Sequence, residues 1–182
     1  DNSLSGHKLG NLMLVALTSL TGDFGKAVSE MQKMFKTSGK ILPSTIESVS
    51  IWAKTSVGEK VYREENIDLG RFTGKIESLH IKPIMPSAPK EVIRAIEEAD
   101  GIIAGPGDLY TTILPVLLVP EIINSIKKSS AKKIFVVNVA NKSFETPSYS
   151  IFDYVNAIDR HCGVGVFTHF LTNPIIRVPS RK

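Results

Sequence analysis

The stretch from Gly101 to Pro115 reads GIIAGPGDLYTTILP and sets a short apolar strand directly before a glycine-rich loop. Two glycines around Pro106 allow a ligand to approach the backbone closely, because glycine has no side chain in the way. Hydroxyl side chains follow beside the N–H groups of the next turn, an arrangement that can hold an anion. We call residues 105–112 the GPG loop. Its candidate ligand-binding residues are Gly105, Pro106, Gly107, Asp108, Tyr110, Thr111 and Thr112.

The GPG loop also suits a role without a ligand. Its glycines fit a tight turn from a strand into a helix, and Tyr110 would then pack on the edge of the sheet. Asp108 would repel a phosphate held close to it, so it is better suited to cap the turn, to bond a ribose hydroxyl or to meet a metal ion. The pattern as a whole favours ligand binding.

Outward from this loop, strand and helix patterns alternate from residue 89 to residue 171. Such alternation favours a mainly parallel sheet covered by helices on both faces, and thus the α/β class. In open parallel sheets, ligands bind beyond the carboxyl ends of the strands. We expect helices at 89–99, 119–128 and 150–161, and strands at 101–104, which should be buried, 133–139 and 167–171.

The N-terminal part begins with a helical hairpin. The segment 10–20 is nearly all apolar at helical spacing, which predicts a buried helix. Thr21-Gly22-Asp23 ends that helix and supplies an N-cap for an amphipathic helix over 24–35.

A β-hairpin is expected next. Residues 40–54 and 60–67 alternate in polarity on either side of a Val57-Gly58 turn, and 75–82 predicts a third strand of the same kind. Because this pattern interrupts the helical and parallel-strand segments, we expect the β-hairpin to be an insertion in the α/β domain.

Two further loops could contribute to a site. The 5–12 loop, SGHKLGNL, places glycines before a helix whose first turn offers free N–H groups and the positive end of its dipole. A structural role explains the same pattern equally well: the glycines would permit tight packing, and His7 would be a surface residue. Its candidate ligand-binding residues are Gly6, His7, Gly10 and Asn11.

The 138–150 loop, NVANKSFETPSYS, follows the strand expected at 133–139 and groups polar side chains at its carboxyl end. Asn138 and Asn141 are suited to read a base or a sugar. Thr146 and Ser150 are also good N-caps, and the spacing slightly favours capping of the next helix. The candidate ligand-binding residues of this loop are Asn138, Glu145, Thr146 and Tyr149.

Composition bounds the remaining possibilities. The 182 residues are 42% hydrophobic and 22% charged, so we expect one α/β domain over 1–182, incomplete at both ends and part of a longer protein. No apolar run reaches the roughly 20 residues of a membrane span.

The single cysteine, Cys162, excludes an intramolecular disulfide and favours a reducing compartment, the cytoplasm. The net charge of +4 is scattered, and no aromatic residues interleave with the lysines, so nucleic acid is not an expected partner.

The histidines indicate no catalytic or metal-binding residue. His161 lies beside Cys162 at an expected helix end, without another histidine near in sequence to orient the pair, which favours a structural role. His80 and His169 fall on expected strands, and neither has the spacing of a metal ligand.

Several segments match one known family in order along the chain. They are GHKLGNL (6–12), LTGDFGKAV (20–28), GKILPST (39–45), ADGIIAGPGDLYTTILPVLLVPEI (99–122) and NVANKSFETPSYS (138–150), with Asp153 and His161 after them. Together they resemble the YvcK/CofD-like family of gluconeogenesis factors and phospholactate transferases. The pattern GPG-x-LYT-x-x-LP is similar to the YvcK-type branch, whereas the transferase branch tends toward GPSNP. Asn141 and Phe144 depart from the T-x-x-GET pattern that is usual in the family.

The resemblance implies a Rossmann-like three-layer fold that binds nucleotides. YvcK-type proteins bind UDP-sugars, notably UDP-N-acetylglucosamine, and influence carbon metabolism, cell shape and peptidoglycan synthesis. No turnover is established for that branch, so we expect a regulatory protein rather than an enzyme. The alternative is a transferase that moves a phospholactyl group from a nucleotide diphosphate carrier to a deazaflavin alcohol. Mg²⁺ is expected only under that alternative; a homo-oligomer is expected in either case.

Overall fold

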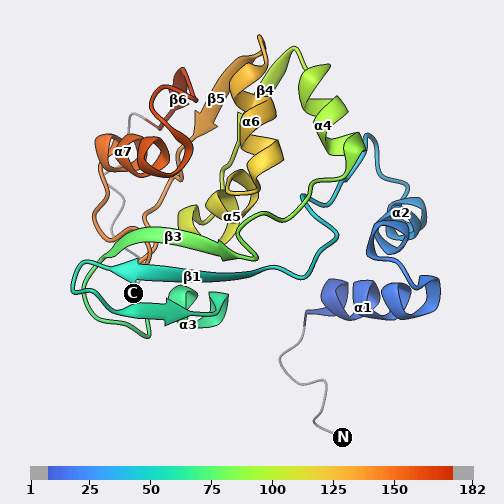
Figure 1. Ribbon diagram of the computed structural model, residues 1–182, viewed down its shortest axis with the longest axis horizontal. Helices are drawn as coiled ribbons and strands as arrows, with labels where there is room; N and C mark the ends of the chain where they lie inside the picture. The colour runs from blue at the N-terminus through green and yellow to red at the C-terminus, as the bar shows by residue number, and fades with distance from the viewer. Residues whose placement is uncertain (1–7, 174–182) are drawn as a thin grey trace, which may run out of the picture.

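The computed structural model describes residues 8–173 and confirms the α/β class (Figure 1). The helices are α1 (Leu9–Thr21), α2 (Phe24–Phe35), α3 (Glu64–Asp68), α4 (Lys90–Glu97), α5 (Leu114–Leu117), α6 (Pro120–Lys128) and α7 (Ile151–Cys162), with a π-helical turn, η2 (Leu109–Ile113), before α5. The strands are β1 (Ser50–Thr55), β2 (Lys60–Tyr62), β3 (Ile76–Lys82), β4 (Gly101–Ala104), β5 (Lys132–Val136) and β6 (His169–Leu171).

The second half of the chain forms the expected parallel sheet, in the order β4-β5-β6. Ala104 lies opposite Phe135, and Phe135 lies opposite Phe170. The strand expected at 101–104 has the predicted bounds, whereas β5 and β6 are shorter than predicted. Pairing nevertheless continues one residue beyond β5, because the N–H of Val137 donates to the carbonyl of Leu171 at 2.9 Å.

The expected β-hairpin joins the strand after it in a separate antiparallel sheet, in the order β2-β1-β3. Trp52 of β1 lies opposite Tyr62 on one side and His80 on the other. The turn at Val57-Gly58 is confirmed, and the N–H of Gly58 donates to the carbonyl of Thr55 at 2.9 Å. The predicted insertion is therefore a small sheet rather than a lone hairpin.

The prediction of long strands on either side of that turn was wrong. β2 ends at Tyr62, and Arg63 takes a φ of 74°, which turns the chain into α3. α3 in turn buries Ile67 completely, so an apolar residue that was assigned to a strand packs from a helix. β1 begins only at Ser50, where its pairing with Lys82 starts.

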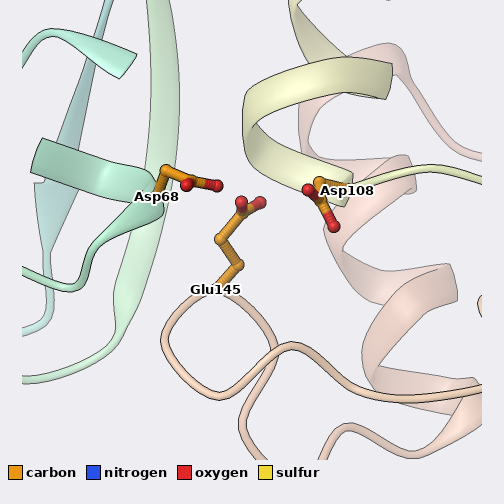
Figure 2. A group of neighbouring side chains, drawn as sticks. All are labelled: Asp68, Asp108 and Glu145. Carbon is orange, nitrogen blue, oxygen red and sulfur yellow. The ribbon is translucent and has the colours of Figure 1, made fainter. Parts of the chain in front are cut away.

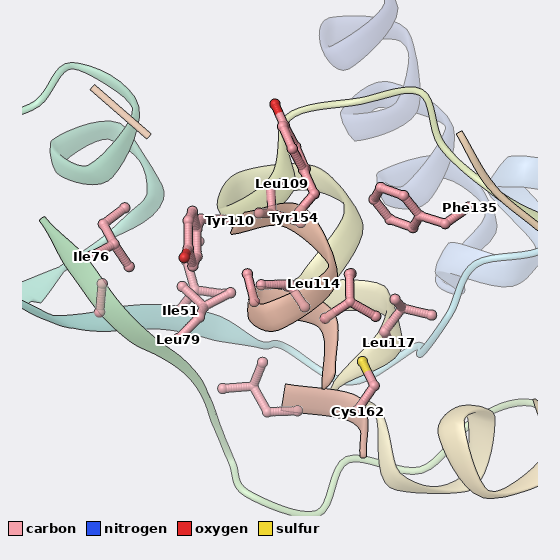
Figure 3. Packing of buried hydrophobic residues seen from close by; sticks show 14 of the residues in the cluster. Ile51, Ile76, Leu79, Leu109, Tyr110, Leu114, Leu117, Phe135, Tyr154 and Cys162 are labelled. Carbon is pink, nitrogen blue, oxygen red and sulfur yellow. The ribbon is translucent and has the colours of Figure 1, made fainter. Parts of the chain in front are cut away.

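One hydrophobic cluster joins the two sheets. Figure 3 shows Ile76 and Leu79 of β3 gathered with Leu114 of α5, and Tyr154 of α7 in the same cluster. Phe135 of β5 extends the cluster to the parallel sheet. The antiparallel sheet is thus packed against the helices that follow the parallel strands, which brings α3 toward the GPG loop.

The helix expected to be buried, α1, is largely exposed. Leu9, Val15 and Leu20 are 73%, 68% and 83% exposed, and no residue of α1 is buried. Among the described residues α1 packs against α2, and Figure 1 shows this hairpin to one side of both sheets. The prediction of burial failed because one amphipathic neighbour covers only part of an all-apolar helix. The N-cap of α2 is confirmed, since Asp23 accepts from the N–H of Lys26 at 2.7 Å.

β4 is also less buried than its apolar sequence predicted. Ile103 is 66% exposed, because among the described residues β4 pairs only with β5. Beside it lies a hollow of about 380 Å³ with mainly apolar walls that include Ile102, Val116 and Ile122. This hollow reaches Gly105, at the start of the GPG loop.

No single described helix is long and apolar enough to cross a membrane. The segments Leu109–Leu117 and Pro120–Lys128 pass that test of length and composition only as a pair, bent by 73°. Both segments contribute buried residues to the hydrophobic core, including Leu114 and Ile122.

Candidate functional site

The carboxyl ends of the three parallel strands lead into one group of loops. The GPG loop follows β4, the 138–150 loop follows β5, and Thr172 and Asn173 follow β6. A hollow of about 220 Å³ lies here, next to the start of α7. Its lining residues are Val137, Asn138, Val139, Asn141, Tyr149, Ser150, Ile151, Tyr154, Thr172 and Asn173. We call this hollow the strand-end pocket.

The GPG loop is tied closely to β5. Gly105 has a φ of 90°, and a Cβ atom there would lie 2.7 Å from the backbone oxygen of Val136, so only glycine fits. The N–H of Gly107 donates to Oδ1 of Asn138 at 2.9 Å. The backbone of the GPG loop is therefore held by a side chain that also lines the strand-end pocket. Pro106 is exposed beside these two anchored glycines.

A buried carboxylate fixes the far end of the GPG loop. Glu145 is 1% exposed, and its Oε2 accepts from the N–H groups of Tyr110 at 2.9 Å and Thr111 at 3.2 Å. Its Oε1 accepts from the hydroxyl of Thr111 at 2.6 Å. Glu145 thus satisfies the first N–H groups of η2, where a negative charge is favourable. Thr112, by contrast, is exposed.

Tyr110 and Tyr149 join the same two loops through their hydroxyl groups, which are 2.9 Å apart. Tyr110 is 1% exposed, so its ring belongs to the core. Burial, followed by the neighbouring Tyr149, raises the pKa of Tyr110, so its phenol stays neutral. Tyr149 is half-buried and lines the strand-end pocket.

Three carboxylates from separate segments converge beside the GPG loop. Figure 2 shows Asp68 of α3, Asp108 before η2 and Glu145 of the 138–150 loop, with their carboxylates directed toward one another. Among the described residues their oxygen atoms form a group that could hold a metal ion, since one from each lies within 4.8 Å of the others. We call these residues the acidic trio.

The ammonium group of Lys142 contacts every member of the acidic trio. Its Nζ lies 2.6 Å from Oδ2 of Asp108 and 3.1 Å from Oε1 of Glu145, and it also pairs with Asp68. Burial by itself lowers the pKa of Lys142, but hydrogen bonds to Asp108 and Asp68 and the charge of the third carboxylate outweigh burial and raise the pKa. Lys142 is therefore a firmly protonated partner of the trio.

Two expected caps are wrong and one is confirmed. Asp108 makes no side-chain capping bond to η2, and its carboxylate is instead bound by Lys142. Thr146 does not cap α7; its buried hydroxyl accepts from the N–H of Lys142 at 3.0 Å and from the phenol of Tyr154 at 3.3 Å. Ser150 caps α7 in a reciprocal capping box with Asp153.

The described part of the 5–12 loop does not lie at this site. Gly6 and His7 lie outside the described residues. Gly10 and Asn11 belong to α1, where Asn11 is exposed, and Figure 1 shows α1 well apart from α7 and β5. The structure thus gathers the candidates of the GPG and 138–150 loops, but it does not bring Gly10 or Asn11 to them.

Asp108 and Glu145 of the acidic trio were candidates in the sequence, but sequence reasoning missed Asp68 and the partner of the trio, Lys142. Asp68 followed a segment that was assigned to a strand, so nothing in its neighbourhood placed it near the GPG loop. Lys142 gave one usable signal, its i, i+3 spacing from Glu145 within a loop already chosen as a candidate. The expectation that the histidine at 161 is structural agrees with its contacts, because Nε2 of His161 accepts from the N–H of Leu79 at 2.9 Å.

Comparisons with known proteins agree on one family. The family model described as 2-phospho-L-lactate transferase CofD matches residues 1–181. The gluconeogenesis factors of Halalkalibacterium halodurans and Bacillus subtilis are 41% and 42% identical to the chain over 172 residues. These alignments cover 94% of this chain in both cases, but only 53% and 54% of those proteins.

A solved structure supports the same assignment. The crystal structure of a UPF0052 family member from Bacillus halodurans superimposes with a TM-score of 0.89 at 40% sequence identity, covering 97% of this chain and 57% of that one. The chain thus spans little more than half the length of these relatives. It belongs to the CofD/UPF0052 family, in which its curated relatives are gluconeogenesis factors of the YvcK type.

Proposed function

We propose that this chain is part of a YvcK-like regulatory protein that binds a nucleotide-sugar of the UDP-N-acetylglucosamine type. Through that ligand it would couple carbon metabolism to cell-wall synthesis in the cytoplasm. Relatives at 41% and 42% identity carry the name gluconeogenesis factor, which supports the regulatory branch.

One observation carries the proposal: the anchored GPG loop meets the strand-end pocket at the carboxyl end of a parallel sheet. This is where open α/β sheets bind their ligands. The bond from Gly107 to Asn138 links the loop to the pocket wall. The glycines of this loop let a diphosphate approach the backbone closely.

The lining of the strand-end pocket suits the neutral part of such a ligand. Its described walls carry amide and hydroxyl groups and no charged side chain. Groups of this kind donate and accept hydrogen bonds, as a uracil base or a hexose requires. An ionic substrate would leave its charge unpaired in this pocket.

The second candidate is a phospholactate transferase, which the name of the matching family model favours. Such an enzyme would transfer a phospholactyl group from a nucleotide diphosphate carrier to a deazaflavin alcohol and would use Mg²⁺ to neutralise developing charge. The acidic trio is the feature of the described residues that favours this candidate.

Calorimetric titration of the full-length protein separates these functions. The ligands are UDP-N-acetylglucosamine, UDP-glucose and GDP, each with and without Mg²⁺. Binding of a UDP-sugar without turnover, with a raised melting temperature, is the expected result. A preference for GDP that requires Mg²⁺ would establish the transferase, and no binding by any of them would contradict both functions.

A matched pair of variants tests the site itself. Asn138→Ala removes the acceptor for Gly107 and should weaken UDP-sugar binding by about fivefold, since a lost hydrogen bond is worth about 1 kcal/mol. Asn124→Ala, on the exposed face of α6, should leave the affinity unchanged. Equal affinities in the two variants would place the ligand elsewhere.

A further inference from the structure

The acidic trio already holds a cation that belongs to the chain. An ammonium group has three N–H donors, and Lys142 has three carboxylate partners in Asp68, Asp108 and Glu145. Its donors are therefore satisfied by the trio, which leaves none for a phosphate. Lys142 thus differs from a lysine that reaches out of a loop to bind a nucleotide.

A magnesium ion does not fit the trio while Lys142 is in place. Mg²⁺ needs oxygen ligands at about 2.0–2.1 Å in an octahedral arrangement. The oxygens that would supply them already contact Nζ of Lys142. Two positive centres sharing the same oxygens would repel each other strongly at this partly buried position. The three carboxylates are suitable ligands for a cation, but the ammonium group of Lys142 already occupies the position between them.

We propose that Lys142 is the resident cation of the acidic trio and that the native trio binds no divalent metal. The ammonium group of Lys142 links α3, which follows β2 in the chain, to the start of η2 and to the 138–150 loop. Lys142 is accordingly a positioning residue, which fixes Asp108 and with it the GPG loop. The occupation of the trio by Lys142 does not depend on the proposed nucleotide-sugar, but it removes the trio as support for the Mg²⁺-dependent transferase.

The test is Mn²⁺ binding to the full-length protein, followed by electron paramagnetic resonance in the absence of nucleotide. Lys142→Met removes the charge and keeps the length of the side chain. This variant should gain one Mn²⁺ site that is at least about tenfold tighter than any binding in the unmodified protein, because the three carboxylates are left without the cation that neutralises them. The matched control is Lys128→Met, an exposed lysine at the end of α6, which should gain nothing.

Two further variants assign the new site to the trio. Adding Asp68→Asn to Lys142→Met should abolish the gained Mn²⁺ site, whereas Lys142→Arg, which keeps the positive charge, should gain none. A natively folded Lys142→Met variant that binds no Mn²⁺ would overturn the proposal. So would a gained site that survives Asp68→Asn.

A measurement on the unmodified protein covers the case in which Lys142→Met does not fold. The backbone amides of Tyr110 and Thr111 donate to Glu145, so a manganese ion in the trio would broaden their NMR signals. The proposal expects these signals to stay sharp at millimolar Mn²⁺. Selective broadening of both amides would show a divalent ion in the native trio and would contradict it.

Discussion

The buried carboxylate of Glu145 accepts a hydrogen bond from the backbone N–H of Tyr110 at 2.9 Å, across 35 residues of sequence. This bond joins the loop after β5 to the first turn of η2, which follows β4. Neighbouring parallel strands are thus linked a second time, beyond their carboxyl ends. The shape of the GPG loop therefore depends on a residue that lies outside it.

Replacing Glu145 by glutamine should destabilise the fold. Glutamine offers one oxygen where glutamate offers two, so at least one donor among Tyr110, Thr111 and Lys142 loses its partner. We expect the free energy of unfolding to fall by about 1–3 kcal/mol, the usual cost of an unsatisfied buried group. Urea denaturation of Glu145→Gln against Glu97→Gln, an exposed position on α4, measures it. Equal midpoints would mean that the carboxylate does not hold the loop.

Gly105→Ala should be more damaging than a glycine substitution with free space around it. The new methyl group would lie 2.7 Å from the backbone oxygen of Val136, and the φ of 90° disfavours any side chain. We expect a loss of about 2 kcal/mol or more. Gly22→Ala is the control: its φ is 68° but nothing lies within 4 Å, so about 1 kcal/mol is expected. Thermal melts of both variants compare the two effects.

Local patterns were sufficient to predict most of the fold. The Asp23 cap, the strand at 101–104 and the capping serine at 150 each depend on neighbours within a few residues, and each was found where it was expected. The burial of α1 and of Ile103 was wrong because it depends on which segments lie opposite. The segment at 60–67 was wrong because Arg63 turns the chain at a φ that favours glycine, and a non-glycine residue gives no signal for such a turn.

The sequence indicated which loops form the site, but not which of their residues contact one another. Glycines and hydroxyls marked the GPG loop, and polar side chains marked the 138–150 loop. The bond between Gly107 and Asn138 spans 31 residues, and the pair of Lys142 with Asp68 spans 74. The first contact requires β4 to pair with β5, and the second requires the two sheets to pack together, so no local pattern contains either of them.

Cys162 should be unreactive in the native protein. Its side chain is 1% exposed, and burial raises the pKa of its thiol to about 12, so almost no thiolate forms at pH 8. We expect its reaction with a thiol reagent such as dithionitrobenzoate to be at least about a hundredfold slower than in denaturant. In denaturant, the single cysteine should release one equivalent of product. Rapid stoichiometric labelling of the folded protein would contradict its burial.

The stability of the protein should fall as the pH drops through the titration of His161. Burial is the largest cause that lowers the pKa of His161, and the charges of Arg160 and His80 act in the same direction. Its Nε2 accepts from Leu79, so a proton there would set two N–H groups against each other. The native state therefore favours the neutral ring more strongly than the unfolded state does.

The sign of the effect follows from proton linkage. The ordinary pKa of a histidine side chain is 6.5. As the pH falls toward and below this value, His161 takes up a proton in the unfolded chain but resists it in the native protein. The stabilisation by the neutral ring is therefore complete above pH 6.5 and is lost as the pH falls. His161→Gln keeps an acceptor for Leu79 but does not titrate, so its unfolding free energy should change less between about pH 7.5 and about pH 5.5. The pKa of His80 is also lowered by burial, so the unfolding free energy of His161→Gln should still depend somewhat on pH. An unchanged pH dependence of the unfolding free energy in His161→Gln would exclude the neutral ring of His161 as its origin.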